Sequence, residues 1–339
     1  IFLHLIPAVL AETNVILITV DSLRADRLEP YGYEGVKTPA ISRLAREGVT
    51  FERVIAQTPL GVPSYASILT GTYPQFHGLQ NAVGHLSKDI PILAEYFQEE
   101  GYETGAFVGS GLLLSQWGFN RGFGTYDDHF STSTSKPTDF DRLQRRAERV
   151  AGNASEWVKK IRGKPFFLWL QFSDPHEPYT PPAPYSEDYT ATPYDGEIAY
   201  IDSVLSGFLD FLEKEDLYKS ALIALTSPHG TALSEHGEMS HGLFLYQSTL
   251  HVPLILKLAN GKLPVSEDQK RVTARVSGQV RSIDLAPTLI GLLSKKVPDS
   301  MHGESLIDHM RSLGARSDLP AYSETHFPNT EYGLSLIHI

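Results

Sequence analysis

The sequence has 339 residues and contains no cysteine. Disulfide bonds, thiolate nucleophiles and cysteine-ligated zinc are therefore excluded. Positive charge is also scarce: 29 Lys and Arg residues against 40 Asp and Glu residues give a net charge of −11, with the basic residues scattered. Surfaces that bind nucleic acid are typically basic stripes, so we expect no nucleic-acid partner. An acidic chain can still bind an anionic ester, because a bound metal ion or a helix dipole reverses the local sign of the charge.

Long apolar runs are missing too, and we expect no stable membrane span. Residues 1–11, IFLHLIPAVLA, are apolar but fall short of the roughly 20 residues that span a bilayer. Val9 and Ala11 occupy the small positions that precede a signal-peptide cleavage point, so we interpret 1–11 as the remnant of a secretory signal. That interpretation predicts a periplasmic or extracellular protein; an apolar first strand is the alternative. We expect residues 12–339 to form a single domain that is truncated at its C-terminus.

Short apolar runs alternate with amphipathic stretches along the chain. The runs predict buried strands, and the stretches between them predict helices. At the start of the first helix, Thr38 is the expected cap, Pro39 suits the first turn and Gly48 ends the helix. Strands that alternate with helices predict an α/β fold with a mostly parallel sheet and helices on both faces. The expected strands are 14–20, 104–110, 166–172, 221–227 and 252–258, and the expected helices are 38–48, 89–101, 141–161, 196–215 and 283–293.

Polar residues gather where the expected strands end. Asp21 follows 14–20, where a carboxylate binds a metal or caps a helix. Asp174 and His176 follow 166–172; Asp174 is suited to orient His176 or to bind metal, and a simple Asx or Pro turn is the alternative. Segment 225–242 is densest in imidazoles and carboxylates, which favours metal ligation or anion contact over a solvated loop. It contains His229, Glu235, His236, Glu238 and His241.

A helix N-terminus is predicted close to residue 61. Pro63 suits the first turn of a helix that runs through Ser64–Thr70, and Gly71 ends it. The residue at 61 would then lie just off the helix N-terminus, where free N–H groups and the helix dipole favour sulfate or phosphate. Residue 61 is glycine, however, and glycine has no side chain with which to attack an ester. A plain helix start with a permissive glycine before it explains the same residues.

Five motifs in a fixed order resemble those of the sulfatases and sulfatase-like hydrolases. They are VDSLRADRLEPYGY, PSYASILTGTYPQFHG, FSDPHEPYTPP, TSPHGTALSEHGEMSHGLFLY and RSIDLAPTLIGLL, and they extend from about Asn14 to Glu324. The resemblance implies a three-layer α/β/α sandwich of the alkaline phosphatase superfamily. It also implies a divalent metal, an activated nucleophile at a helix N-terminus, and hydrolysis of sulfate esters, or sometimes phosphate or phosphonate esters.

The resemblance also implies a metal site, from which this sequence departs. Asp21 matches the first metal ligand, and Ser22 stands where typical sulfatases have a second Asp. His229 matches another ligand, but Pro228 replaces the Asp that usually precedes it. Proline offers no side-chain oxygen, and hard cations prefer several oxygen ligands. Of the divalent metals Ca, Mn and Zn, the remaining His-weighted set would better suit Zn or Mn.

The implied catalytic and substrate positions depart from the family as well. Gly61 falls on the nucleophile position, where neither formylglycine nor a sulfuryl group can form. Tyr65 stands where Arg or His commonly follows the Pro-Ser pair that ends at Ser64. Other departures are Thr231 for a Glu, and Ser110 and Leu112 for the Lys and His that contact sulfate. His176 matches a substrate-contacting histidine, His241 lies near a further expected contact, and we expect Ser64, Tyr65 and Asp174 to bind substrate.

Three hypotheses for the function follow. The first is hydrolysis of a small-molecule or glycan sulfate ester at the divalent-metal site, with a metal-activated water or a hydroxyl of Thr58 or Ser64 replacing the nucleophile. The second is a phosphoester or phosphonoester hydrolase on the same scaffold, which the His-weighted metal set favours. The third is a catalytically inactive member that binds sulfated or phosphorylated ligands, which Gly61, Pro228 and Ser110 favour.

Overall fold

A computed structural model describes residues 13–81, 84–130, 143–263, 274–312, 318–332 and 336–338. The expected signal remnant at 1–11 lies outside these residues and stays a prediction. In the described ranges, no helix combines the length and apolar character that crossing a membrane requires.

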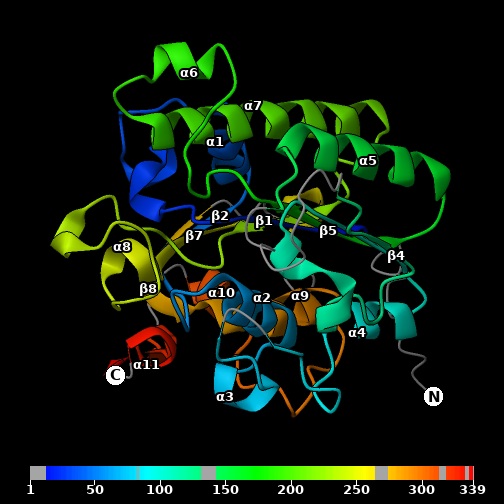
Figure 1. Ribbon diagram of the computed structural model, residues 1–339. Coiled ribbons are helices and arrows are strands. Elements are labelled where there is room, and N and C mark those ends of the chain that lie inside the picture. The colour runs from blue at the N-terminus through cyan, green and yellow to red at the C-terminus, as the bar shows by residue number, and fades with distance from the viewer. Residues whose placement is uncertain are drawn as a thin grey trace, which may run out of the picture.

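An eight-stranded sheet runs through the middle of the molecule in the order β4-β3-β5-β1-β6-β7-β2-β8 (Figure 1). All neighbouring strands are parallel except β7, which is antiparallel to both β6 and β2. A second sheet pairs β9 with β10. The strands are β1 Val15–Val20, β2 Val49–Ile55, β3 Glu103–Val108, β4 Thr125–Asp127, β5 Phe166–Phe172, β6 Leu222–Thr226, β7 His251–Lys257, β8 Ala274–Arg281, β9 Ser323–Thr325 and β10 Leu336–His338.

Helices cover both faces of the large sheet, which confirms the predicted α/β/α sandwich. In Figure 1, α1, α5, α6 and α7 lie above the sheet, and α2, α3, α4, α9 and α10 lie below it. The helices are α1 Pro39–Glu47, α2 Gly61–Thr70, α3 Pro74–His77, α4 Leu93–Glu99, α5 Ala147–Lys160, α6 Tyr185–Asp188, α7 Pro193–Lys214, α8 Gln247–Leu250, α9 Leu285–Leu292, α10 Ile307–Ser312 and α11 Phe327–Tyr332.

Two hydrophobic cores, one on each face of the sheet, explain why the central strands are mostly apolar on both faces. Successive side chains of a strand point to opposite faces. In β1, Val15 and Leu17 belong to the core between the sheet and α2, α4 and α9. Ile16, Ile18 and Val20 belong to the core between the sheet and α1, α5 and α7. A strand that is buried on both sides has no polar face, as expected of a parallel sheet between two helical layers.

Two sequence expectations about helix starts are wrong in detail. Thr38 precedes α1, but its side chain makes no capping hydrogen bond. The carboxylate of Asp202, on α7, instead accepts hydrogen bonds from the N–H groups of Ala40 and Ile41 at 3.0 and 2.8 Å. Similarly, α5 begins at Ala147, later than the expected start at 141: residues 143–146 are not helical, and residues 141 and 142 lie outside the described residues.

Strand order determines which polar segments meet. β5 and β6 flank β1 and run parallel to it, so the carboxyl ends of these three strands lie together at one edge. The residues that follow Val20, Phe172 and Thr226 are therefore neighbours, although they are far apart in sequence. Ligands of open α/β sheets commonly bind at this edge.

Candidate oxyanion and metal site

Asp21 lies in the centre of the carboxyl edge. Its backbone N–H donates to the carbonyl of Phe172 at 2.9 Å, which extends the pairing of β1 with β5 by one residue. Ser22 then turns the chain with a φ of 57°, and Asp21 is only 3% exposed. Burial raises the pKa of Asp21, against the opposing effects of His176 and of hydrogen bonds from Ser22 and Tyr65.

His229 faces Asp21 from the segment that follows β6. Its Nδ1 lies 2.7 Å from the carbonyl oxygen of Gly230, which can only accept, so the proton of a neutral ring is on Nδ1. Nε2 therefore presents a lone pair, and it lies 3.4 Å from Oδ1 of Asp21. Neither of these two buried atoms has a hydrogen-bond partner among the described residues. Burial, reinforced by His241, lowers the pKa of His229 well below its usual value, so the ring stays neutral.

Two unsatisfied acceptors that face each other suit a shared cation. Zinc binds imidazole nitrogen and carboxylate oxygen at about 2.1 Å, which places two ligand atoms of a tetrahedral site roughly 3.4 Å apart. The observed separation of 3.4 Å between Asp21 Oδ1 and His229 Nε2 fits this geometry. In the part of the chain that the structure describes, no group of three or more His, Cys, Asp and Glu side chains is arranged to hold a metal ion. A cation here would have two protein ligands and open positions for oxygens of a bound molecule.

The N-terminus of α2 borders this pair. Gly61 is the first residue of the helix and Leu60 is its N-cap, so residue 61 lies one position further into the helix than the sequence predicts. The first N–H groups of a helix have no partner within the helix, and the side chain of Leu60 makes no capping hydrogen bond. A Cβ atom at residue 61 would lie 3.5 Å from Nε2 of His229. The nucleophile position therefore does adjoin the centre, but it carries no side chain.

Ser64 and Tyr65 are held away from such a nucleophilic role. Ser64 is fully buried, and its hydroxyl donates to the carbonyl of Thr58 at 2.8 Å. Tyr65 is 2% exposed, and its hydroxyl accepts a hydrogen bond from Nε2 of Gln171 at 2.9 Å. Burial, together with the negative charge of Asp21, raises the pKa of Tyr65 well above its usual value. Tyr65 is therefore a neutral phenol beside Asp21.

Three imidazoles form a row that starts at the centre. The ring of His241 lies 4.1 Å from that of His229, and the ring of His176 lies 5.6 Å from that of His241. His241 Nδ1 is 2.9 Å from the carbonyl of Pro59, so its Nε2 is the acceptor nitrogen. Burial lowers the pKa of His241 to about 4, which keeps this ring neutral at physiological pH. The structure thus brings His176, His229 and His241 together.

Asp174 makes different contacts from those the sequence suggested. Its carboxylate binds Arg146 at 2.7 Å and accepts a hydrogen bond from the N–H of Ala147 at 3.1 Å, where α5 begins. Glu197, on α7, lies 3.4 Å from the same guanidinium. A cavity of about 120 Å³ adjoins these residues and His176. Sequence reasoning missed Arg146 and Glu197, because both lie in ordinary amphipathic helical patterns.

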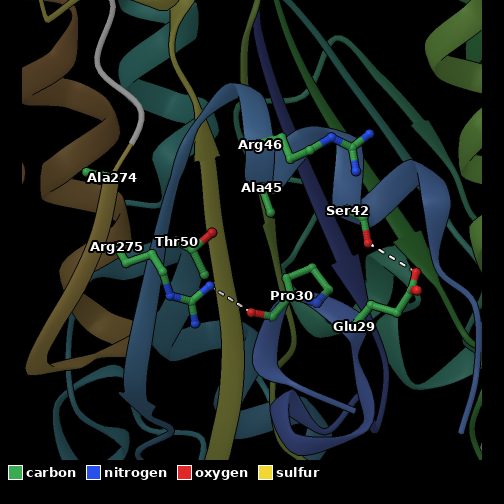
Figure 2. A pocket seen from close by; sticks show the side chains of 8 residues that line it. All are labelled: Glu29, Pro30, Ser42, Ala45, Arg46, Thr50, Ala274 and Arg275. Atoms are coloured by element: carbon green, nitrogen blue, oxygen red, sulfur yellow. Dashed lines mark hydrogen bonds between the residues drawn. The ribbon is translucent and has the colours of Figure 1, made fainter. Parts of the chain in front are cut away.

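A larger cavity, of about 480 Å³, lies elsewhere, between α1, β2 and β8 (Figure 2). Its polar groups are mostly bound to one another. Arg275 donates to the carbonyl of Pro30 at 2.8 Å and binds Glu52 at 2.6 Å, and Glu29 accepts from Ser42 at 3.2 Å. Because Thr50 in its lining is near the start of β2, this cavity is remote from the carboxyl edge.

Comparison with known proteins gives consistent matches. The profile of the family described as Sulfatase matches residues 13–295. The chain is 21% identical to the uncharacterized sulfatase YidJ of Escherichia coli over 92% of its own length and 74% of that protein. It is 23% identical to an arylsulfatase of Clostridium perfringens over 87% of its own length and 78% of that protein.

Solved structures share the fold. A phosphonate monoester hydrolase of Agrobacterium radiobacter superposes with a TM-score of 0.77 at 21% identity, covering 92% of this chain and 80% of that one. The structure of BT4656 in complex with D-glucosamine-2-N,6-O-disulfate also gives a TM-score of 0.77, at 18% identity, covering 96% of this chain and 85% of that one.

Proposed function

Because this chain belongs to the sulfatase family, we propose that it binds sulfate esters at the Asp21–His229 centre and does not cleave them by a covalent route. The observation that carries the proposal is the pairing of two features at one place. Asp21 and His229 retain acceptor atoms aimed at a shared point, while Gly61, beside them, offers no nucleophile. In this proposal the first feature allows the chain to bind the ester, and the second prevents it from forming a covalent intermediate.

Several groups support binding of a tetrahedral oxyanion. A divalent cation held by Asp21 Oδ1 and His229 Nε2 would supply Lewis-acid attraction for the ester oxygens. α2 begins at Gly61, next to His229, and the start of a helix attracts anions through its unpaired N–H groups and its dipole. Because the protein ligands are one nitrogen and one oxygen, zinc or manganese suits the centre better than calcium, which prefers only oxygens.

Neither Ser64 nor Tyr65 is available to replace the missing nucleophile. The Ser64 hydroxyl donates to the carbonyl of Thr58 and is fully buried. Tyr65 is a buried phenol whose pKa lies well above its usual value, so its phenolate is not populated at neutral pH. A covalent intermediate requires an activated hydroxyl, thiol or carboxylate within reach of the ester. These contacts set aside Ser64 and Tyr65, and water is the alternative nucleophile.

Hydrolysis by water is the second candidate, with phosphate or phosphonate esters as substrates. The observation that favours it is His241, whose neutral ring lies 4.1 Å from that of His229 and presents Nε2 as an acceptor. A neutral imidazole in this position is suited to take a proton from water. The fold is shared with a phosphonate monoester hydrolase, and a relative 25% identical to this chain is named a multifunctional alkaline phosphatase superfamily protein.

One set of measurements separates these functions. The protein is freed of metal with a chelator, and calorimetry then follows the binding of 4-nitrophenyl sulfate with and without zinc, manganese or calcium. We expect cation-dependent binding that Asp21→Asn and His229→Gln abolish. Release of 4-nitrophenol from the sulfate, phosphate and phenylphosphonate esters should stay at the level of the Asp21→Asn protein. Wild-type turnover above that level would establish the second candidate and overturn the first.

Restoring the missing groups gives a stricter test. We expect the double variant Gly61→Thr, Pro228→Asp to gain turnover of 4-nitrophenyl sulfate, because it regains a hydroxyl and a second carboxylate at the centre. The single variant Pro228→Asp is the matched control: it should tighten cation binding without producing turnover. A double variant that folds and binds the cation but stays inactive would show that loss of these two groups does not explain the lack of activity.

A further inference from the structure

A buried arginine lies three residues after Asp21. Arg24 is 5% exposed, and its guanidinium binds acceptors in two segments of the chain. Nε and Nη2 donate to the two carboxylate oxygens of Asp26 at 2.9 and 2.8 Å. Nη1 donates to Oε1 of Glu235 at 2.7 Å and to the carbonyl of Thr231 at 3.1 Å. The guanidinium therefore connects the turn after β1 with the segment after β6.

The two connected segments carry the two atoms that face each other at the centre. Asp21 belongs to the segment of Arg24, and His229 belongs to the segment that Arg24 binds. A second contact joins the same segments, because the Ser227 hydroxyl accepts from the N–H of Leu23 at 3.1 Å and donates to the carbonyl of His229 at 2.6 Å. These bonds restrict relative movement of the segments where Asp21 Oδ1 and His229 Nε2 lie 3.4 Å apart.

The aliphatic stem of Arg24 also lies close to the backbone beside His229. A Cβ atom at Gly230, the next residue, would lie 3.1 Å from Cγ of Arg24 and 2.1 Å from the carbonyl oxygen of Ser248. The N–H of Gly230 donates to the carbonyl of Thr249 at 2.8 Å. The backbone that follows His229 is therefore enclosed between Arg24 on one side and residues 248–249 on the other.

The charge of Arg24 is compensated within this contact. A guanidinium without partners so near Asp21 would repel a cation at the centre. Asp26 and Glu235 form ion pairs with Arg24 at 2.8 and 2.7 Å, and together they carry two negative charges against its one positive charge. The contact thus fixes the two segments without making the surroundings of the centre positive.

Rigid spacing matters more where a cation has few protein ligands. If only Asp21 and His229 bind the cation, ordering either side chain on binding would cost free energy that no further protein ligand offsets. Ligands that the surrounding structure already holds in place avoid this cost. Groups that orient metal ligands typically contribute about 10- to 100-fold to metal affinity.

We infer that Arg24 is a positioning residue, which holds Asp21 and His229 at a cation-binding spacing before a cation is bound. This inference rests on the proposed function, because that pair must bind the cation. Glu235, for which the sequence suggests metal ligation or anion contact, is then a partner of Arg24 that fastens the segment after β6.

Zinc binding to Arg24→Lys tests the inference. Lysine keeps the charge, but its single ammonium group lacks the planar fork with which arginine binds Asp26, Glu235 and the Thr231 carbonyl together. Calorimetry on protein freed of metal should show zinc affinity about ten-fold or more below that of the wild type. Glu235→Ala is a second variant, at a side chain that is 35% exposed and whose loss the fold should tolerate. We expect it to weaken zinc binding about three-fold or more, because Arg24 keeps only the Thr231 carbonyl in that segment.

Arg281→Lys is the matched control for a general loss of stability. Arg281 is 7% exposed and binds the carboxylate of Asp284 at 2.8 Å. It lies on β8, four strand positions from β1, which corresponds to about 19 Å. We expect this variant to lose stability as Arg24→Lys does and to keep the zinc affinity of the wild type.

Cobalt(II) in place of zinc reports the arrangement of the ligands, because its visible absorption depends on their number and geometry. We expect Arg24→Lys to shift the cobalt spectrum, and Arg281→Lys to leave it as in the wild type. A role of Arg24 in stability alone would move neither spectrum in the folded protein.

The outcomes separate this inference from the proposed function. Wild-type zinc affinity in folded Arg24→Lys, or equal losses of affinity in Arg24→Lys and Arg281→Lys, would overturn the positioning role alone. Should Arg24→Lys not fold, wild-type affinity in Glu235→Ala would overturn it. If the folded wild-type protein binds no zinc, or if Asp21→Asn binds zinc as tightly as the wild type, the proposed function fails and this inference fails with it.

Discussion

At position 61 the backbone has room for a side chain. The nearest atoms that a Cβ would meet are Nε2 of His229 at 3.5 Å and a ring carbon of Tyr65 at 3.9 Å, both ordinary van der Waals contacts. Gly61 is also absent from the glycines with positive φ, so its backbone suits any residue. Neither sterics nor backbone conformation therefore requires glycine at position 61. The glycine affects only the chemistry of the centre, because it provides no nucleophilic side chain.

Gly61→Ala should consequently be tolerated. We expect its free energy of unfolding to stay unchanged or to rise by up to about 1 kcal/mol, because alanine loses less conformational entropy than glycine in a helix. Gly230→Ala is the contrasting control, since its Cβ would lie 2.1 Å from the carbonyl oxygen of Ser248 and should destabilise the fold strongly. Urea denaturation measures both. Equal destabilisation of the two variants would show that residue 61 is sterically restricted after all.

Single residues also mark where sequence reasoning stops. The departures at Gly61 and Pro228 could be recognised from the motifs, because the identity of the residue alone removes a function. The contacts of Ser64 and Tyr65 could not, since they depend on which way a buried hydroxyl points. The Ser64 hydroxyl donates to the carbonyl of Thr58, six residues away in the sequence. The Tyr65 hydroxyl accepts a hydrogen bond from Gln171, which lies far away in the sequence on β5.

Among the elements, helix starts depend on partners from elsewhere in the chain. Thr38 stands where a cap is expected, yet its buried hydroxyl has no hydrogen-bond partner among the described residues. Asp202 supplies the acceptors for α1 from the middle of α7, 162 residues away along the chain. This contact also fixes α1 against α7 on the upper face of the sheet (Figure 1).

Removing each candidate cap of α1 in turn should separate their contributions to stability. Asp202→Ala should lower the free energy of unfolding by about 1–2 kcal/mol, the usual cost of losing a helix cap. Thr38→Val should be neutral or slightly stabilising, because it removes a buried hydroxyl without a partner and keeps the shape of the side chain. Chemical denaturation monitored by circular dichroism provides the comparison. A larger loss in Thr38→Val than in Asp202→Ala would restore threonine as the cap.

Strand prediction succeeded in the interior of the sheet and missed strands toward its edges. Residues 14–20, 104–110, 166–172, 221–227 and 252–258 all contain strands, because these runs are mostly apolar. Residues 49–55 form β2 although Glu52 and Arg53, neither of which is buried, interrupt the apolar pattern. Strand β8, at the edge, alternates buried and exposed residues and lacks a continuous apolar run. Edge strands need less burial, so composition reveals them less clearly.

At the scale of the whole molecule, the centre exists only because the sheet brings distant strand ends together. Asp21, His176 and His229 follow three different strands, and their contact depends on β5 and β6 flanking β1. The parallel-sheet expectation was sufficient to predict that such residues meet at one edge. The sequence could not predict the 3.4 Å contact of Asp21 with His229 or the buried network of Asp174, Arg146 and Glu197.

That network ties the stability of the whole fold to pH. It joins the loop after β5 to α5 and α7, with two buried carboxylates around one guanidinium. Burial, followed by the charge of Asp174, raises the pKa of Glu197 from its usual 4.5 to about 7. Between these two values the folded chain holds a proton at Glu197 that the unfolded chain has released. Stability linked to this group is therefore complete below about pH 4.5 and is lost as the pH rises through 7.

Glu197→Gln should remove this dependence, because the amide keeps the shape of the side chain and carries no charge at any pH. Between pH 5 and pH 8, we expect the wild-type free energy of unfolding to fall relative to that of the variant by about 2 kcal/mol, allowing for partial solvent screening. Asp210→Asn is the control, as it removes an exposed carboxylate from the same helix and should leave the wild-type profile unchanged in shape. Melting curves across this pH range measure all three proteins. Parallel profiles for the wild type and Glu197→Gln would mean that Arg146 keeps Glu197 ionised, and the network would then stabilise the fold at neutral pH and not weaken it.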